Sequence, residues 1–375
     1  MIVIYGATGL AGELIARELC ERGVTLVLAG RDRGRLLELA ASLPTEPEVR
    51  VAHVHDASAL REACDGARVV IGCAAPFARV GSAVLEAAIK SGAHYVDICG
   101  EQPFLRETYE AYEAAAHRAG VVCVSGLGFR IALGDWAAAL AHQNLSSGDG
   151  ADDPGDERQL DELSISYALA KPHLTARERA MAASLLSSPT LIWERDRWQT
   201  MAPGAQRRRV GFGEKFGEQE AVLFGGGEVI TVPRHIEART IKTYLWIETK
   251  NPLLWEATRI APLLSPLLGP LVTGPLGRFV RAQADAMSEP VGARERAETE
   301  FVLVATATRG FDSSRVVLRG HDPYRLTAEI CSAGALALAK RPHAGGGFLA
   351  PAQVFDPRAR LYSLAARELI EVEES

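Results

Sequence analysis

The sequence has few cysteines and no C-x-x-C pair, since its six cysteines stand far apart along the chain. This spacing argues against a structural zinc site and against a disulfide framework. Most of them lie in apolar stretches, such as Cys73 at the end of VVIGC and Cys123 within VVCV. Buried, reduced thiols are therefore the simpler interpretation. Neither a metal-ligand spacing nor a Ser-His-Asp order is visible, so we expect no metal.

The sequence also lacks an excess of positive charge. Its 41 basic and 47 acidic residues give a net charge of -6, so no global positive field favours nucleic acid or an anionic membrane surface. The only dense basic run is Arg207–Arg209. An isolated run of this kind predicts a solvated turn rather than a polyanion site. We therefore expect no nucleic-acid partner.

No uninterrupted apolar run is long enough for a membrane span. The most apolar segment, residues 260–275, is broken by Pro262, Pro266, Pro270 and Pro275, each of which removes a helix donor. It is also shorter than the roughly 20 residues that a spanning helix needs. The chain starts directly with strand-like MIVI, without a charged leader or cleavage site. We therefore expect a cytoplasmic protein without a membrane span.

Short apolar runs alternate with amphipathic segments through the first part of the chain. Predicted strands cover residues 2–5, 24–29, 49–54, 69–73, 94–98 and 121–124, and predicted helices cover 10–22, 33–43, 57–64, 81–91 and 103–119. This alternation is typical of βαβ units and of a parallel sheet covered on both faces. We predict an α/β fold, with a doubly wound Rossmann domain over residues 1–130.

The pattern changes after Gly126. The polar, acidic stretch 148–159 predicts an exposed loop, and strands are predicted at 163–169, 229–232, 240–248, 300–308 and 315–318. Strands with few helices between them indicate a second, α+β domain with a mixed or antiparallel sheet. We place this domain at 131–334. The tail from about residue 333 to 369 is predicted to be helical again, with a break at the glycines 345–347.

A glycine-rich turn directly follows the first predicted strand and opens a helix. Its sequence, GATGLAG at residues 6–12, has G-x-x-G-x-x-G spacing. Glycines at these places let the backbone turn tightly and approach a pyrophosphate, which free amides at the helix N-terminus can bind. A glycine turn without a ligand is the alternative, but strand, turn and helix supply the context that the motif needs. The predicted cofactor contacts here are Gly6, Ala7, Thr8, Gly9, Leu10 and Gly12.

The end of the second predicted strand indicates which dinucleotide binds. A site specific for NAD usually places an acid there, to bind the ribose 2′-hydroxyl. This sequence has Arg31 at that point and Arg33 close behind, and guanidinium groups bind a 2′-phosphate well. We therefore predict NADP(H) in preference to NAD(H). Asp32 leaves NAD open, and the arginines could instead only solvate the start of a helix.

Three further loops follow predicted strands, and in this fold such loops line the dinucleotide crevice. The first contains Ala74, Ala75, Pro76 and Phe77, and its proline could fix a loop along the ribose and nicotinamide. Gly100 and Gly126 follow the next two strands and are predicted to lie near the reactive end of the cofactor. A simple strand-ending turn is the alternative for the loop at 74–77.

With these motifs the chain resembles the saccharopine dehydrogenase-like oxidoreductases, and most closely their branch of trans-acting enoyl reductases. The likeness is carried by YGATGLAGELIARELCERG (5–23), LAGRDRGRL (28–36), AAPF (74–77), GAHYVDICGEQPF (92–104), SGLGFRIALGDW (125–136), VPRHI (232–236), DPYRLTA (322–328) and GGGFLAPAQVF (345–355). These motifs are spread over nearly the whole chain, and their order is more telling than any single one.

The resemblance implies a nicotinamide cofactor, a substrate and dimerisation domain at 131–334, and a C-terminal segment, 335–375, that returns to the Rossmann domain. It also implies a homodimer formed through the second sheet. Relatives act on imines, amino-acid adducts or conjugated double bonds, so the resemblance leaves the substrate open. Arg130, Ile131 and Ala132 stand where relatives usually carry a small polar residue and proline, and the segment 175–178 also departs from the pattern.

Reduction of a polar double bond needs a proton donor within hydrogen-bond reach. Glu101 and Asp97 are candidates because they follow a strand beside the predicted crevice. Their alternatives are structural: a salt bridge in the loop for Glu101 and a helix cap for Asp97. Tyr167 and Lys171 match the Y-x-x-x-K of short-chain dehydrogenases, but they lie in a segment predicted as strand, which would separate them by roughly 13 Å. Tyr167 could still donate a proton alone.

We therefore predict an NADPH-dependent reductase that transfers a hydride to a C=N or activated C=C bond of a small biosynthetic intermediate. One alternative is a binding protein that senses NADP(H) without turnover. Another is a carbonyl reductase of the short-chain type, for which Tyr167 would be essential.

Overall fold

The computed structural model describes residues 1–146, 159–172, 189–202, 204–249, 274, 292–341 and 346–375. The chain forms two compact units, Met1–Leu133 with Tyr324–Phe355, and Gly134–Pro323 with Asp356–Ser375. The predicted loop at 148–159, the segment 175–178 and the apolar segment 260–275 lie outside the described residues, apart from residues 159 and 274. Within the described residues, no helix combines the length and apolar character that crossing a bilayer requires.

The first unit contains a seven-stranded parallel sheet with the order β15-β6-β5-β4-β1-β2-β3. Its strands are β1 (Ile2–Tyr5), β2 (Leu26–Gly30), β3 (Glu48–Val51), β4 (Val69–Gly72), β5 (His94–Asp97), β6 (Val122–Val124) and β15 (Gly347–Phe348). Every residue of β1, β2, β4 and β5 is buried, as expected for strands covered on both faces. The order confirms the predicted doubly wound Rossmann fold.

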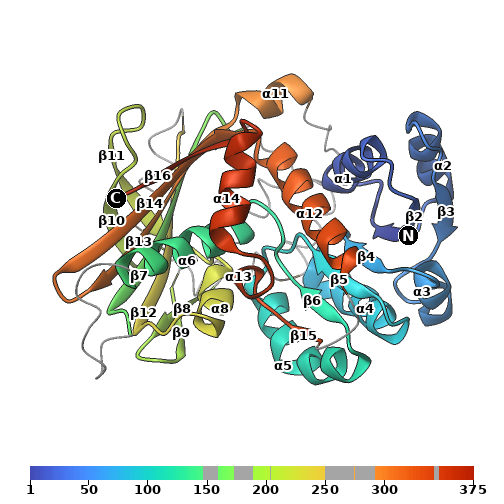
Figure 1. Ribbon diagram of the computed structural model, residues 1–375, viewed down its shortest axis with the longest axis horizontal. Coiled ribbons are helices and arrows are strands. Elements are labelled where there is room, and N and C mark those ends of the chain that lie inside the picture. Colours follow the sequence, from blue (N-terminus) through green and yellow to red (C-terminus); the bar gives the residue numbers. More distant parts are fainter. Residues whose placement is uncertain (147–158, 173–188, 203, 250–273, 275–291, 342–345) are drawn as a thin grey trace. The chain divides into compact units, whose positions relative to one another are not determined.

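Helices follow the strands of the first unit in turn (Figure 1). They are α1 (Leu10–Glu21), α2 (Arg33–Ser42), α3 (Ala57–Cys64), α4 (Phe77–Lys90), α5 (Gln102–Ala119), α12 (Pro323–Lys340) and α13 (Pro351–Val354). The helix α4 begins four residues earlier than predicted, at Phe77, directly after the cis peptide bond Ala75–Pro76. The phenyl ring of Phe77 is buried against Phe104 of α5, so the start of α4 is fixed by packing that the helical period alone does not reveal.

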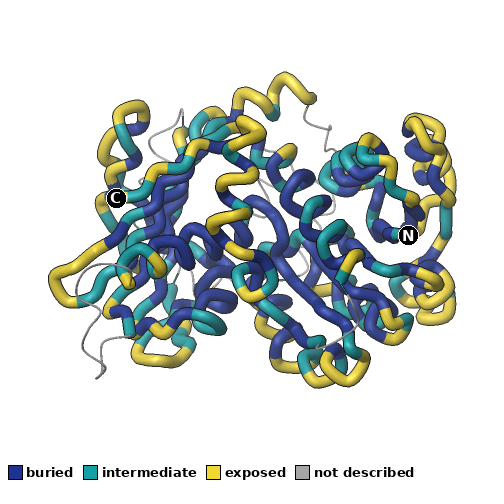
Figure 2. Tube along the Cα trace, in the orientation of Figure 1, coloured by how far each residue is buried: buried dark blue, intermediate teal, exposed yellow. Residues whose placement is uncertain are grey.

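The helix α12 brings the chain back to the first unit. Its apolar face buries Leu326, Ile330 and Leu338, and Glu329 forms an ion pair of 2.5 Å with Arg22, next to the end of α1. In Figure 2 the central strands of this unit have the dark blue of buried residues. The buried face of α12 explains why a segment so late in the sequence belongs to the first unit.

The second unit contains a nine-stranded mixed sheet. Its strands are β7 (Glu162–Ala170), β8 (Thr190–Glu194), β9 (Trp198–Met201), β10 (Arg207–Gly211), β11 (Glu218–Leu223), β12 (Thr240–Ile247), β13 (Glu300–Arg309), β14 (Asp312–His321) and β16 (Ile370–Glu374). The main path runs β10-β11-β12-β7-β13-β14-β16, and only β12 and β7 pair in parallel along it. This sheet confirms the predicted α+β second domain with mixed pairing.

Among the described residues, the helices of the second unit are short, apart from α6 (Ala132–Ser146) and α14 (Pro357–Ala366). The others are α8 (Glu228–Thr231), the 3-10 helix η1 (Val232–Arg234) and α11 (Ala293–Glu298). The strand predicted at 229–232 was wrong, because these residues form α8 and the start of η1. All four residues of α8 are buried, so their apolar run reflects burial on every side and not the alternation of a strand.

The basic run Arg207–Arg209 is a strand and not the predicted solvated turn. It forms most of β10, which pairs antiparallel with β11. Arg207 forms an ion pair of 2.8 Å with Glu220, and the guanidinium of Arg208 pairs with Glu162. Acidic residues from two other strands, Glu220 of β11 and Glu162 of β7, therefore pair with two of the three arginines.

The C-terminal segment divides between the two units, which corrects the prediction that all of 335–375 returns to the Rossmann domain. Residues up to Phe355 belong to the first unit and those from Asp356 to the second. The strand β16 extends the second sheet beside β14, because its alternating sequence IEVEE suits a half-buried edge strand.

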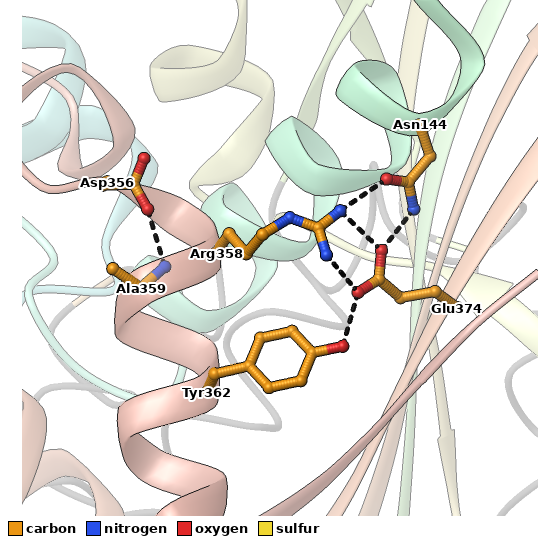
Figure 3. A network of polar contacts seen from close by, with 6 residues as sticks. All are labelled: Asn144, Asp356, Arg358, Ala359, Tyr362 and Glu374. Carbon is orange, nitrogen blue, oxygen red and sulfur yellow. Dashed lines mark hydrogen bonds and ion pairs between the residues drawn. The ribbon is translucent and has the colours of Figure 1, made fainter. Parts of the chain in front are cut away.

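A network of polar side chains fixes this last strand (Figure 3). The carboxylate of Glu374 accepts two hydrogen bonds from Arg358, of 2.8 and 2.9 Å, one from Tyr362 of 2.7 Å and one from Asn144 of 2.6 Å. These donors come from α14 and α6, and α14 is itself capped by Asp356, which accepts from Ala359 N at 2.6 Å. One carboxylate thus joins β16 to two helices of its own unit.

Candidate dinucleotide site

The turn between β1 and α1 is built so closely that two of its residues must be glycine. Gly6 has a φ of +83°, and a Cβ there would lie 2.6 Å from the backbone nitrogen of Ala74. At Gly12 a Cβ would lie 2.5 Å from the carbonyl oxygen of Gly6. Both contacts are with backbone, which cannot move aside cheaply. The turn is therefore the compact backbone cradle that a pyrophosphate requires.

The amides at the start of α1 suit an anion. Gly9 is the N-cap residue, and the first hydrogen bond of the helix ladder runs from Glu13 N to Gly9 O at 2.8 Å. The amides of Leu10, Ala11 and Gly12 precede that ladder and lie at the positive end of the helix dipole. The amide of Gly9 itself is turned inward and donates to Gly6 O at 3.1 Å. Ala7 is buried and packs beneath this turn.

The end of β2 presents arginines to solvent. Arg31 and Arg33 are exposed, and within the described residues no carboxylate lies at ion-pair distance from either of them. The carboxylate of Asp32 caps α2, since its Oδ1 accepts a hydrogen bond of 3.1 Å from Arg35 N. Asp32, the residue that kept NAD open in the sequence, therefore serves the helix start.

Arg35, the third arginine after β2, makes a contact with the glycine-rich turn that the sequence did not predict. Its Nη2 donates a hydrogen bond of 3.2 Å to the carbonyl oxygen of Thr8, within the glycine-rich turn. The guanidinium thus links the start of α2 to the turn after β1. Because Arg35 stands three residues after the N-cap Asp32, the sequence predicts that it lies in the first turn of a helix. It does not predict the hydrogen bond to Thr8.

The loop after β4 is held by Glu101. Ala74 and Ala75 lie in this loop, Pro76 is the N-cap residue of α4, and Phe77 opens the helix. The Glu101 carboxylate accepts hydrogen bonds from Phe77 N at 2.8 Å and from Ala78 N at 3.0 Å. A carboxylate at a helix N-terminus stabilises the free amides and the dipole. Glu101 thus fastens the loop after β5 to the loop after β4.

Asp97 fastens the loop after β5 to the loop after β6. Its fully buried carboxylate accepts hydrogen bonds of 2.9 Å from both Cys99 N and Gly126 N, and one of 2.6 Å from Ser125 Oγ. Burial raises the pKa of Asp97 to about 6, and these hydrogen bonds oppose the shift. Sequence reasoning missed Ser125, whose hydroxyl has no signal of its own in the pattern.

Gly100 lies against an arginine from the next loop. A Cβ at Gly100 would lie 3.0 Å from both Cζ and Nε of Arg130. The half-buried guanidinium of Arg130 therefore rests on the backbone after β5. The carboxyl ends of β4, β5 and β6 thus carry three loops that are joined by Glu101, Asp97 and this packing contact.

Tyr167 belongs to the second unit and lies on β7, as the strand prediction required. Its hydroxyl donates a hydrogen bond to Glu228, a fully buried residue of α8. Lys171 follows the end of the strand with a φ of +47°, and its Nζ lies 3.5 Å from Glu300. Tyr167 and Lys171 therefore do not share a helix face, so the Y-x-x-x-K match lacks its structural context.

A second buried polar pair lies in the same unit. Asp135 of α6 is fully buried, and its Oδ2 lies 3.0 Å from Nε2 of His235, which follows η1. Burial and the nearby His235 lower the pKa of His142, also on α6. Among the described residues no group of three or more potential ligands could hold a metal ion.

Comparison with known proteins identifies this architecture. Residues 2–124 match the family model of the saccharopine dehydrogenase NADP binding domain. The first unit is therefore similar to a saccharopine dehydrogenase NADP binding domain. The match confirms the predicted family resemblance and the predicted NADP(H) cofactor.

Some curated relatives match about a third of the chain, and one match covers most of it. A saccharopine dehydrogenase-like oxidoreductase of Mus musculus is 29% identical over 34% of this chain and 34% of its own length. Matches of this kind span only about a third of the curated relatives. A trans-acting enoyl reductase of Mycobacterium leprae is 24% identical over 90% of this chain and 88% of its own length.

A solved structure supports the fold of the whole chain. The apo saccharopine dehydrogenase (L-Glu forming) of Saccharomyces cerevisiae aligns with a TM-score of 0.66 and 13% identity, covering 100% of this chain and 99% of that one. At this identity the likeness concerns the fold, and it agrees with a Rossmann unit followed by a mixed-sheet unit.

Proposed function

We propose that the protein is an NADPH-dependent reductase that transfers a hydride to a C=N or activated C=C bond of a small biosynthetic intermediate. The observation that carries this proposal is the pairing of a closed glycine cradle at Gly6 and Gly12 with exposed arginines after β2. The family model of the domain and the enoyl reductase aligned over most of the chain support it.

The preference for NADPH over NADH rests on charge. Arg31 and Arg33 supply two cations at the strand end where the adenosine ribose lies in this fold, and Asp32 directs a carboxylate oxygen to the amide of Arg35. A 2′-phosphate gains charge-assisted hydrogen bonds from such guanidinium groups. A 2′-hydroxyl gains little from them.

The bound NADPH would supply the hydride, and the chain's part is to hold the cofactor and handle a proton. Among the predicted catalytic residues, Asp97 and Glu101 accept hydrogen bonds from loop amides. This favours positioning roles for both, in loops that line the reactive end of the cofactor. Tyr167 donates its hydroxyl proton to the buried Glu228 within the second unit, and its role as a proton donor stays a prediction that the substitution below tests.

The test combines binding with turnover. NADPH and NADH are titrated into the protein by fluorescence, and NADPH oxidation is then followed with small cyclic imines and conjugated enones. Oxidation with one of these classes is the expected result. Tight NADPH binding without oxidation by any of them would favour the alternative of a non-catalytic NADP(H) sensor. No binding of either nucleotide would refute the reductase.

The substitution Tyr167→Phe tests whether the tyrosine is the proton donor or takes no part in the reaction. If Tyr167 is the proton donor, the substitution should reduce kcat at least about a hundredfold, the lower end of the usual effect of a general acid, with unchanged NADPH affinity. Unchanged turnover would remove Tyr167 from the mechanism and with it the short-chain type of carbonyl reductase.

We also propose a homodimer that forms through the sheet of the second unit. Its support is the long mixed sheet of that unit. Multi-angle light scattering should return twice the chain mass, and a monomer mass at micromolar protein would contradict it. The cytoplasmic location stays a prediction.

A further inference from the structure

Asp135 and His235 form a carboxylate–histidine pair in the second unit. Asp135 lies in the first turn of α6 and is fully buried. Its Oδ2 lies 3.0 Å from Nε2 of His235, which directly follows η1. The two residues are 100 positions apart in the sequence, so only the folded unit brings them together. They belong to SGLGFRIALGDW and VPRHI, two segments that carry the family resemblance, and the proposed function assigns a role to neither of them.

The ring of His235 presents one nitrogen to Asp135 and keeps the other for a ligand. The side chain of His235 is 12% exposed, whereas that of Asp135 is 0% exposed. Within the described residues Nδ1 makes no hydrogen bond, and it is not among the fully buried polar atoms there. A carboxylate that accepts a hydrogen bond from Nε2 holds the ring in one orientation and stabilises its protonated form. This is the arrangement of an acid–base histidine with its orienting carboxylate.

A second histidine on α6 adds no positive charge beside this ring. His142 stands seven residues after Asp135, on the same side of the helix. Burial lowers the pKa of His142, and nearby His235 and Arg309 lower it further, so its ring is uncharged at neutral pH. Arg309, at the end of β13, donates a hydrogen bond of 3.2 Å to the carbonyl oxygen of Leu145 near the end of α6. A protonated His235 therefore faces the carboxylate of Asp135 and a neutral His142.

The helix α6 ties the pair to the loop after β6. Ala132, the first residue of α6, donates its amide proton to Gly126 O at 3.1 Å and to Gly128 O at 3.0 Å. Asp135 follows three residues later, about 4.5 Å along the helix axis. The loop after β6 stands at the carboxyl edge of the parallel sheet, where ligands of this fold bind. The carboxylate that orients His235 is thus carried by the same short stretch of chain as one loop of the candidate site.

We propose that His235 is the proton donor of the reductase and that Asp135 positions it. The inference rests on the proposed function and adds a catalytic residue to it. One carbon of the C=N or C=C bond accepts a hydride from NADPH, which leaves as NADP⁺. The electron pair of that bond then binds the proton from Nδ1, on the nitrogen of an imine or on the α-carbon of an enone. The neutral imidazole is protonated again by water. The hydroxyl proton of Tyr167 is instead donated to the buried Glu228.

The experiment follows NADPH oxidation with pyrroline, a cyclic imine, and with cyclohexenone, a conjugated enone. His235→Gln keeps an amide that can donate to Asp135 but cannot titrate. It should lower kcat at least about a hundredfold and leave NADPH affinity unchanged. Wild-type kcat should fall as the pH rises through the range in which an imidazole loses its proton, and the remaining kcat of the variant should not. Added imidazole should restore part of the kcat of His235→Ala.

Asp135→Asn tests the positioning role. It keeps the size of the side chain, but a neutral amide does not stabilise the imidazolium, so kcat should fall while KM changes little. The matched control is His321→Gln, an exposed histidine at the end of β14 in the same unit. It should keep the kcat and the pH profile of the wild type. Circular dichroism and urea unfolding check that each variant is folded, and Asp135→Asn decides by its kcat if His235→Gln is not.

Three outcomes separate the inference from the proposed function. Unchanged kcat in His235→Gln would overturn the inference. A lowered kcat that keeps the wild-type pH profile, without rescue of His235→Ala by imidazole, would overturn it too, because it marks a structural role. NADPH binding by the wild type without oxidation by either probe would instead refute the proposed function.

Discussion

Asp97 offers the sharpest test of how the loops at the sheet edge are held. Burial raises the pKa of its carboxyl from 3.8 to about 6, a difference worth about 3 kcal/mol at 1.36 kcal/mol per unit. Between roughly pH 4 and 6 the folded state keeps the proton while the unfolded chain releases it. The folded state then binds more protons, so the free energy of unfolding falls as the pH rises through this window and is level above it.

The substitution Asp97→Asn removes the ionisation and keeps the shape. Its Oδ1 can accept from Cys99 N and Gly126 N as the aspartate does, and its Nδ2 can donate to Ser125 Oγ, which rotates to accept. At neutral pH the variant avoids a buried charge worth about 3 kcal/mol and loses about 1 kcal/mol from a weaker hydrogen bond to Ser125. We expect it to be about 1–2 kcal/mol more stable than the wild type at pH 7, and less stable below pH 5.

The measurement is urea unfolding, followed by circular dichroism at half-unit steps between about pH 4.5 and 7.5. The control Asp97→Ala leaves the donors of Cys99, Gly126 and Ser125 without their acceptor, at about 1–3 kcal/mol each, and should be destabilised at every pH. A constant difference between wild type and Asp97→Asn across the window would refute the raised pKa. So would a difference of the opposite sign.

Three further predictions concern the cofactor and the C-terminal strand. Arg31→Ala and Arg33→Ala should each weaken NADPH binding by about tenfold to a hundredfold in fluorescence titrations, with NADH unaffected; an equal loss for both nucleotides would contradict the role in 2′-phosphate binding. Gly12→Ala should weaken both nucleotides by at least about tenfold, because its Cβ would lie 2.5 Å from Gly6 O; unchanged affinity would show that the turn is not the cradle. Burial acts to raise the pKa of Glu374, but hydrogen bonds from Tyr362, Asn144 and Arg358 outweigh it and lower that pKa. Glu374→Gln should therefore cost about 1–2 kcal/mol at pH 7 in urea unfolding, and this loss should shrink as the pH falls below about 4; a loss independent of pH would contradict it.

Sequence reasoning worked best where structure is set by neighbours in the chain. The alternation of apolar strands and helices predicted the Rossmann fold, because β1, β2, β4 and β5 are buried on both faces. It failed at residues 229–232, where an apolar run is a short helix buried on all sides. It also failed at Arg207–Arg209, whose acidic partners come from other strands. In both places the deciding contacts are distant in the sequence.

The candidate site shows the same limit in a different form. The glycine spacing predicted the cradle, because backbone clearance at Gly6 and Gly12 depends only on the local turn. The hydrogen-bond partners of the carboxylates, in contrast, could not be predicted from the local sequence. Asp97 and Glu101 stand where a catalytic acid would stand, yet each accepts hydrogen bonds from amides of a neighbouring loop, and those amides come close only after the sheet has formed.

This arrangement has a kinetic consequence that separates a positioning acid from a proton donor. If Asp97 and Glu101 act by holding loops, Asp97→Asn keeps the oxygen that accepts both amide hydrogen bonds, and Glu101→Gln keeps one of its two acceptors. Each amide variant should then retain more kcat than the alanine variant, in which the released loop also raises KM. A proton donor would behave differently, because Asn or Gln removes the acid as completely as Ala does. Equal losses of kcat in Glu101→Gln and Glu101→Ala, with a pH profile flattened on the basic side, would assign Glu101 to proton transfer. A clearly larger loss in Glu101→Ala than in Glu101→Gln would assign Glu101 to the hydrogen bonds that it accepts from Phe77 N and Ala78 N.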